Sequence, residues 1–178
     1  MDARGRFVNL APFGHCSCNR MRSGKAPTLC AGRYVFMEEG KATRFTPRRQ
    51  EEVEAVVLDD CVFQDKELRC DGLFLWRQAR RGGQKIAALV ELKGSGDLPH
   101  AFAQLAHVQK NRRHYQQLLD VLNDEPGGHA REKAVIVTNG QLKKTDQERL
   151  EREHGIRVAV VQHREPTRPI PDLREQLF

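Results

Sequence analysis

The sequence has no apolar run long enough to cross a bilayer, which takes roughly 20 consecutive apolar residues in a helix. The N-terminus also lacks the hydrophobic stretch of a secretory signal peptide. These two absences predict a cytoplasmic protein with no membrane segment. Thiols stay reduced in that compartment, so we expect the five cysteines to be free.

Motifs of several common functional classes are also missing. The chain contains no P-loop, no glycine-rich dinucleotide fingerprint and no nucleophile elbow. A zinc site is weakly indicated, because imidazole and thiolate are preferred zinc ligands but their spacing here is irregular. The candidate zinc ligands are His15, Cys16, Cys18 and Cys30. Free thiols are the favoured interpretation, and Cys61 and Cys70 are interpreted as small core residues.

Positive charge is concentrated at one end of the chain. Of 30 basic and 24 acidic side chains, residues 1–50 hold ten basic and three acidic ones, so the net charge of +6 arises there. We interpret residues 1–46, which are rich in Gly, Pro and Arg, as a basic, irregular extension. Phosphate neutralisation supplies most sequence-independent affinity for nucleic acid, so this arm favours a polyanionic substrate. The alternative is a solvated extension without a partner.

Two strands predicted over residues 68–76 and 85–93 carry the most informative side chains. The turn signal Arg81-Gly82-Gly83 lies between them, so the pair is expected to form an antiparallel hairpin. Side chains alternate across a strand, so Glu91 and Lys93 share one face and the residue between them points the other way.

Asp71 brings a second carboxylate from the neighbouring strand toward Glu91. Two carboxylates at one place repel each other and resist ionisation unless a cation lies between them. Mg²⁺ (or Mn²⁺) suits this position, because it takes oxygen ligands and needs only one or two protein carboxylates beside water and substrate phosphate. Lys93 would complete a phosphate-cleaving site.

Asp71 followed by Glu91-x-Lys93, then Gly94-Ser95-Gly96 and a helix, resembles the active site of the PD-(D/E)XK superfamily of restriction-endonuclease-like nucleases. The resemblance implies that Asp71 and Glu91 hold the divalent metal together with the backbone carbonyl of Leu92. It also implies that Lys93 positions or activates the attacking water.

The resemblance covers roughly residues 50–162, and the expected elements follow the family's order. The predicted elements are a helix over 48–58 that Thr46 and Pro47 begin, strands over 61–66, 68–76 and 85–93, a long helix from Asp97 that ends by Gly127-Gly128, a strand over 133–138, a helix capped by Thr145 and Glu148 that stops near Gly155, and a strand over 157–161. This is an α/β fold with a mixed central β-sheet flanked by helices, an αβββαβ restriction-endonuclease-like core with an extra αβ unit. The nuclease domain is predicted over 47–163, before a Pro-containing tail over 164–178. One departure is Cys70, which stands where the family's name has proline.

The predicted first helix offers further acidic candidates. Members of the superfamily often place another metal-binding Glu in this helix, and Glu51, Glu52 and Glu54 are available. Glu54 borders the core face, because Val57 and Leu58 follow it at helical spacing. A solvated first turn, where the helix dipole favours acidic side chains, explains all three equally well.

The long helix carries a second group of polar side chains. His100, Gln104, His107, Asn111 and His114 recur at helical spacing and are expected to form one stripe. Several members of the superfamily carry a Gln at the place of Gln104, where it supports the catalytic lysine or a phosphate. We therefore add Gln104 to the predicted catalytic residues Asp71, Glu91 and Lys93. A solvated helix face is the alternative for the whole stripe.

These observations predict a metal-dependent nuclease that hydrolyses phosphodiester bonds of nucleic acid, with DNA favoured over RNA, in repair, recombination or defence. The nuclease-like core has no separate recognition domain, which favours a partner protein that delivers the substrate. Cleavage of both strands of a duplex by one small site would be simplest in a homodimer. The alternative is a nucleic-acid-binding or assembly subunit that keeps the fold without turnover.

Overall fold

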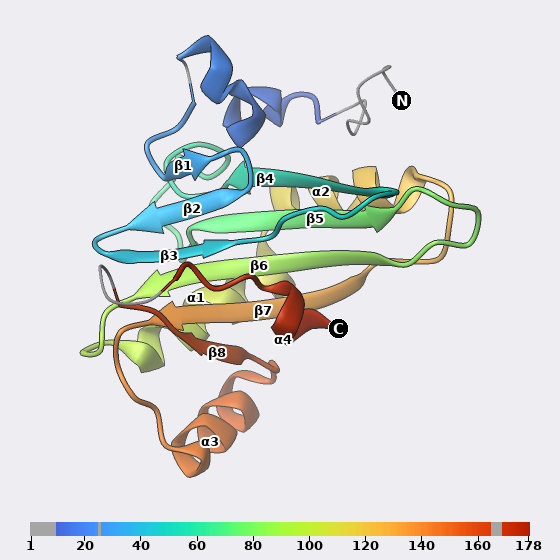
Figure 1. The fold of residues 1–178 in the computed structure, drawn as a ribbon. Helices are drawn as coiled ribbons and strands as arrows, with labels where there is room; N and C mark the ends of the chain where they lie inside the picture. The colour runs from blue at the N-terminus through green and yellow to red at the C-terminus, as the bar shows by residue number, and fades with distance from the viewer. Residues whose placement is uncertain (1–9, 25, 165–168) are drawn as a thin grey trace.

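The fold is a mixed α/β arrangement built on a five-stranded sheet, seen in a computed structural model that describes residues 10–24, 26–164 and 169–178 (Figure 1). Residues 1–9 of the predicted extension and 165–168 of the predicted tail lie outside this range. The sheet order is β4-β5-β6-β7-β8. The strands are β4 (Glu51–Val57), β5 (Gly72–Gln78), β6 (Lys85–Lys93), β7 (Arg131–Thr138) and β8 (Ala159–Gln162).

The direction of each strand follows from how it is connected. Strands β4, β5 and β6 pair antiparallel through direct connections, whereas β7 and β8 run parallel to β6. Parallel neighbours need a crossover, and helices supply it. Helices α1 (Leu98–Asn111) and α2 (Arg113–Asp124) join β6 to β7, and α3 (Lys144–His154) joins β7 to β8. The predicted mixed sheet with flanking helices is confirmed.

All three crossover helices pack on one face of the sheet. We call the buried cluster on this face the helix-side core; it includes Leu73, Leu89, Phe102, Leu119 and Leu150. The prediction of a single long helix is wrong, because the helix is interrupted at one residue. Arg112 has an extended backbone, with φ −92° and ψ 111°, and it separates α1 from α2.

The other face is covered by the N-terminal segment, which the sequence led us to expect as irregular. Strands β1 (Cys30–Gly32), β2 (Val35–Glu38) and β3 (Lys41–Arg44) form an antiparallel sheet that follows the short 3-10 helices Phe13–Cys16 and Cys18–Ser23. The β2–β3 turn has positive φ at both Glu39 and Gly40, as a two-residue hairpin turn requires. Glu39 is not among the residues typical of this position, so the dipeptide gave only a weak turn signal.

The second cluster, which we call the opposite core, joins the two sheets. It includes Phe36 and Phe45 from the N-terminal segment beside Phe74 and Trp76 of β5. The ring centroids of Phe36 and Phe74 are 4.5 Å apart. Figure 1 shows the C-terminal helix α4 (Arg174–Leu177) on this side of the sheet, and Leu177 joins the same cluster. The described parts of the predicted extension and tail thus share one core with the predicted nuclease domain.

Two expected elements at the start of the domain are wrong. The predicted helix over 48–58 is strand β4, because Val53, Ala55 and Val57 alternate into the opposite core while Val56 turns to the helix side. The predicted strand over 61–66 lies in the loop between β4 and β5. Three consecutive antiparallel strands are present as expected, but the first of them is β4 rather than the segment 61–66.

The capping prediction for α3 is also wrong, although the predicted end of that helix is confirmed. The helix begins at Lys144 after Lys143, so Thr145 lies inside its first turn rather than at the cap. It ends at His154, and the next residue, Gly155, adopts the left-handed conformation with φ 60°.

Two disulfides overturn the expectation of five free thiols. Cys16 is bonded to Cys61 and Cys18 to Cys30, which leaves Cys70 as a buried thiol. The first bond ties the N-terminal segment to the loop between β4 and β5. In the described part of the chain, no helix combines the length and the apolar character that a membrane span requires.

Candidate active site

The predicted site residues meet where β5 begins and β6 ends. Gly72 pairs with Val90 across the two strands, so Asp71 and Glu91 lie beside this pair. Odd-numbered side chains of β5 and β6 face the helices, as Leu73 and Leu89 do in the helix-side core. Asp71, Glu91 and Lys93 therefore share the face against which α1 packs.

Burial makes the two carboxyl groups hard to ionise. Asp71 is 8% exposed and Glu91 2% exposed. Burial raises the pKa of Asp71 to about 7; the backbone N–H of Leu92, which donates to Asp71 Oδ2 at 2.6 Å, acts in the other direction. Burial, and then the neighbouring Asp71, raise the pKa of Glu91 to about 9. The pair therefore retains a proton at neutral pH unless a cation compensates it.

The oxygen atoms of Glu91 fit a divalent metal. Oε2 of Glu91 is buried and makes no hydrogen bond to any residue that the structure describes. Oε1 lies 3.5 Å from the ammonium nitrogen of Lys93. A buried carboxylate oxygen without a donor is costly, and a hard cation bound jointly with Asp71 would satisfy it. The Leu92 side chain joins the opposite core, and its backbone N–H is the group that donates to Asp71.

Gln104 fixes the position of Lys93. Lys93 Nζ donates to Gln104 Oε1 at 3.1 Å, and Gln104 Nε2 donates to the backbone carbonyl of Arg69 at 2.7 Å. Both ends of the amide are thus engaged, which orients it. Asp97, which lies at the start of α1 without a side-chain capping bond, holds Oδ2 4.0 Å from the same ammonium group. The short connection from β6 to α1 brings these groups together.

Asp71 also lines a pocket of about 480 Å³ whose other wall is the N-terminal segment. Glu38 of β2 and the loop residues Asp59 and Asp60 line it as well. Burial raises the pKa of both Glu38 and Asp59, and neighbouring acidic groups add to it. The sequence reasoning missed these three carboxylates, because Glu38 reaches the site only through the unpredicted N-terminal sheet. Arg20 lines the same pocket, and Arg69 pairs with Asp59 and Asp60, so the walls carry charges of both signs.

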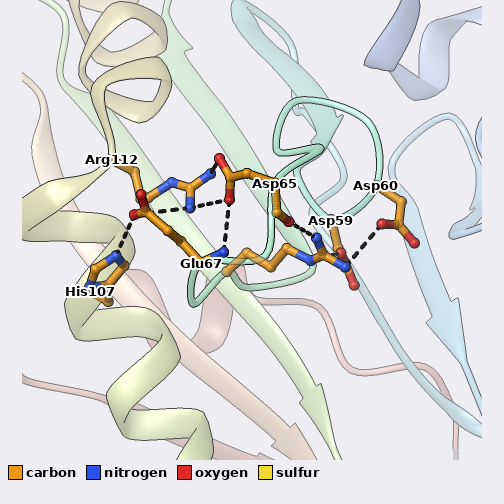
Figure 2. A network of polar contacts seen from close by, with 7 residues as sticks. Asp59, Asp60, Asp65, Glu67, His107 and Arg112 are labelled. Carbon is orange, nitrogen blue, oxygen red and sulfur yellow. Dashed lines mark hydrogen bonds and ion pairs between the residues drawn. The ribbon is translucent and has the colours of Figure 1, made fainter.

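A polar network attaches the β4–β5 loop to α1 (Figure 2). Arg112 donates to both oxygens of Asp65, at 2.8 and 2.7 Å, and its guanidinium lies 4.1 Å from the Phe63 ring centroid. His107 Nε2 lies 3.1 Å from Glu67. Arg69 in the same loop forms ion pairs with Asp59 and Asp60. The network holds the backbone of this loop, including the carbonyl group that receives the Gln104 amide.

The acidic candidates on the predicted first helix lie elsewhere. Glu54 pairs opposite Leu75, four residues from Asp71 along β5, a rise of about 13 Å. Its Oε2 accepts hydrogen bonds from Ser17, at 2.8 Å, and from Asn19. Glu51 is bonded to Arg174 and Glu52 to Arg77. All three side chains are engaged in structural contacts.

The expected single polar stripe is divided. His107 and Asn111 hydrogen-bond to each other at 3.3 Å on α1, and exposed His100 lines a groove of about 320 Å³ beside Gln104. His114 lies beyond the break at Arg112, with its ring centroid 5.1 Å from that of Phe13. Among these residues Gln104 contacts the candidate catalytic group.

The expected zinc ligands do not form one set, because Cys18 and Cys30 are bonded to each other. His15, Cys16 and Cys61 place one donor atom each within 4.8 Å of one another. Cys61 was not among the expected ligands, and it lies 45 residues from Cys16 in the sequence.

Comparisons with family models, curated proteins and solved structures gave no match to this chain.

Replacing the buried carboxylate should stabilise the metal-free protein at alkaline pH. The pKa of Glu91 rises from 4.5 to about 9 on folding. The protonated carboxyl group therefore stabilises the folded state fully below about pH 4.5, and this stabilisation is lost as the pH rises toward about 9. We expect Glu91→Gln in chelator to melt above the wild type near about pH 8 and to match it near about pH 4. Mg²⁺ should raise the melting temperature of the wild type but not of the variant. Equal melting near pH ~8 would contradict the buried-carboxyl interpretation.

Proposed function

We propose that this chain is a Mg²⁺-dependent phosphodiesterase that hydrolyses nucleic acid, with DNA as the favoured substrate. The observation that carries the proposal is the contact between Lys93 and two groups at once, Glu91 at 3.5 Å and Gln104 at 3.1 Å, beside Asp71 at the wall of a pocket. Phosphate hydrolysis needs a positive group held in a fixed position beside groups that can bind a metal. Lys93, oriented by the Gln104 amide next to the buried carboxylate pair, meets this need.

Asp71 and Glu91 would hold Mg²⁺ (or Mn²⁺), with the Leu92 carbonyl as a further ligand. When bound, the ion would polarise the scissile phosphate and lower the pKa of a water molecule. Lys93 orients that water or offsets charge that develops on the phosphate. Gln104 acts as a positioning residue, because it keeps the ammonium group from turning away.

The resemblance to the PD-(D/E)XK superfamily supports the same function. The antiparallel meander β4-β5-β6, the crossover through α1 and α2, and the parallel strand β7 have the order expected for the βββαβ part of that core. The departure is at the start, where short 3-10 helices and a three-stranded sheet precede β4 and no α-helix of the described chain does. The departure leaves Asp71, Glu91 and Lys93 in place.

The charge distribution supports a polyanionic substrate. The net charge is +6, and exposed Arg48 and Arg49 lie in the turn before β4. Such groups gain affinity by releasing counterions from phosphates, so binding should weaken as salt rises. A homodimer, or a partner protein that delivers the substrate, would suit cleavage of both strands by one small site.

Incubation of the protein with linear, circular, single-stranded and branched DNA and with RNA, with and without Mg²⁺, tests the proposal. We expect cleavage that needs the metal and that a chelator stops. Salt-sensitive binding to these substrates without cleavage under any metal condition would instead favour a binding or assembly subunit. Cleavage that is unchanged in chelator would overturn the metal-dependent mechanism.

Gln104→Ala should lower the single-turnover cleavage rate at saturating substrate by about 10- to 100-fold, the usual cost of losing a group that orients a functional side chain. Substrate affinity should change little, because the amide contacts Lys93 and a backbone carbonyl. Gln117→Ala on the exposed side of α2 is the matched control. A rate equal to that of the control would show that Lys93 needs no orientation by Gln104.

A further inference from the structure

A second group of potential metal ligands lies apart from the carboxylate pair. His15, Cys16 and Cys61 each place a donor atom within 4.8 Å of the other two. Cys16 is fully buried, whereas His15 is exposed and lines the large pocket together with Cys61. The two sulfur atoms form a disulfide, so they bind no metal in this state.

We propose that the reduced protein binds one zinc ion through His15, Cys16 and Cys61, and that the ion then replaces the disulfide as the link between the N-terminal segment and the β4–β5 loop.

The geometry needs little rearrangement. Tetrahedral zinc with Zn–S bonds of about 2.3 Å separates two thiolate sulfurs by roughly 3.8 Å. The α-carbons of Cys16 and Cys61 are 5.7 Å apart, so modest side-chain movement opens that space once the sulfur–sulfur bond is broken. A water molecule can take the fourth position, because the site borders the pocket through His15.

The chemistry balances with an external thiol or phosphine as reductant. A thiol reductant supplies two electrons and two protons, and it leaves as its own disulfide while the protein gains two thiols. A phosphine supplies the two electrons, water supplies the two protons and an oxygen atom, and the phosphine leaves as its oxide. Zinc then displaces both thiol protons and binds the thiolates and a neutral imidazole. His15 Nδ1 lies 3.2 Å from the carbonyl oxygen of Pro12. A ring that donates from Nδ1 leaves the lone pair of Nε2 for the metal.

The other cysteines do not share this environment. Cys16 packs in the helix-side core, whereas Cys18 and Cys30 pack in the opposite core. Cys70 is buried and is not part of the ligand group. The carboxylate pair offers only oxygen ligands, so a metal that binds there differs spectroscopically from one bound by thiolates.

A zinc link would preserve the pocket under reducing conditions. Cys61 directly follows Asp59 and Asp60, and all three line the pocket with Asp71. Oxidised protein holds this loop through the disulfide, and reduced protein would hold it through the metal. The candidate active site would then keep its shape in a cytoplasm-like environment as well as in an oxidising one.

Cobalt substitution in the full chain, reduced with a phosphine, tests the proposal. We expect one equivalent of Co²⁺ to give thiolate-to-cobalt charge-transfer absorption, and zinc to displace it. Cys61→Ser and Cys16→Ser should lose this absorption, and His15→Ala should weaken cobalt binding. Cys70→Ala and the double variant Cys18→Ser with Cys30→Ser are controls that should retain it. Cobalt at the carboxylate pair adds no thiolate band, so the result is independent of nuclease activity.

Alkylation of the reduced wild type gives a second measurement that needs no variant. Zinc should protect Cys16 and Cys61 from a thiol reagent, as mapped on peptides, and should leave the reactivity of Cys18 and Cys30 unchanged. It should also raise the melting temperature of the reduced protein. No thiolate band in the reduced wild type, or equal alkylation with and without zinc, would overturn the proposal.

Discussion

Glu91→Gln should abolish Mg²⁺-dependent cleavage, with a loss on the order of a thousandfold or more in the single-turnover rate. The substitution keeps the shape of a side chain that is 2% exposed but removes the charge that would hold the metal with Asp71. Asp71→Asn should have the same effect for the same reason. Both variants should lose metal binding by calorimetry while they keep the fold.

Lys93→Ala should lower the rate by about 10²- to 10⁴-fold, the usual range for a group that assists proton transfer or charge stabilisation. Metal binding should persist, because Lys93 contacts the carboxylate pair only through Glu91 Oε1. Glu148→Gln and Lys144→Ala on the exposed surface of α3 are matched controls. A folded Glu91→Gln protein that cleaves at the rate of these controls would remove the carboxylate pair from the mechanism.

The hairpin that carries the candidate site was predictable because its signals are local. Continuous apolar runs and a glycine turn define β5 and β6, and the face on which each side chain lies follows from counting residues. Gln104 was also accessible to this reasoning, since a short connection after Lys93 limits how far the next helix can lie. Its contact with the backbone of Arg69 was not, because that loop is placed by Arg112 and Asp65.

Strand β4 was mistaken for a helix because local and tertiary signals conflict there. Thr46, Pro47 and the acidic residues after them are typical of a helix start. The strand forms because Val53 and Val57 pack in the opposite core, and because buried Glu52 and Glu54 find partners from distant parts of the chain. No local pattern identifies such partners.

The N-terminal sheet and the disulfides also depend on contacts between residues that are far apart in the sequence, so local patterns did not predict them. Cys16 and Cys61 are 45 residues apart in sequence, so their pairing depends on where the β4–β5 loop packs. Glu38 reaches the pocket of Asp71 only after β2 and β3 cover the sheet. The pocket wall is therefore a product of long-range packing, whereas the catalytic face is a product of local alternation.

Arg77→Met should lower the free energy of unfolding by about 3–5 kcal/mol, the typical cost of removing one partner of a buried ion pair. The Arg77 side chain is 2% exposed, and its guanidinium donates to Glu52 and Glu125 at 2.5 Å each. Methionine keeps the apolar stem but leaves the Glu52 carboxylate, 7% exposed, without its charged partner. Chemical denaturation should detect the change directly.

The same variant separates stability from catalysis. Arg77 lies six residues along β5 from Asp71, about 20 Å at the rise of a strand, so its loss should leave the single-turnover rate unchanged wherever the protein is folded. Adding Glu52→Gln should recover part of the lost stability, because the unpaired charge is then removed. Arg149→Met is the control, since its exposed pair with Glu153 on α3 should contribute no more than about 0.5 kcal/mol. If Arg77→Met lowers the free energy of unfolding by less than about 1 kcal/mol, water or a side-chain movement compensates the Glu52 carboxylate. The ion pair would then contribute little to the stability of the β4–β5 pairing.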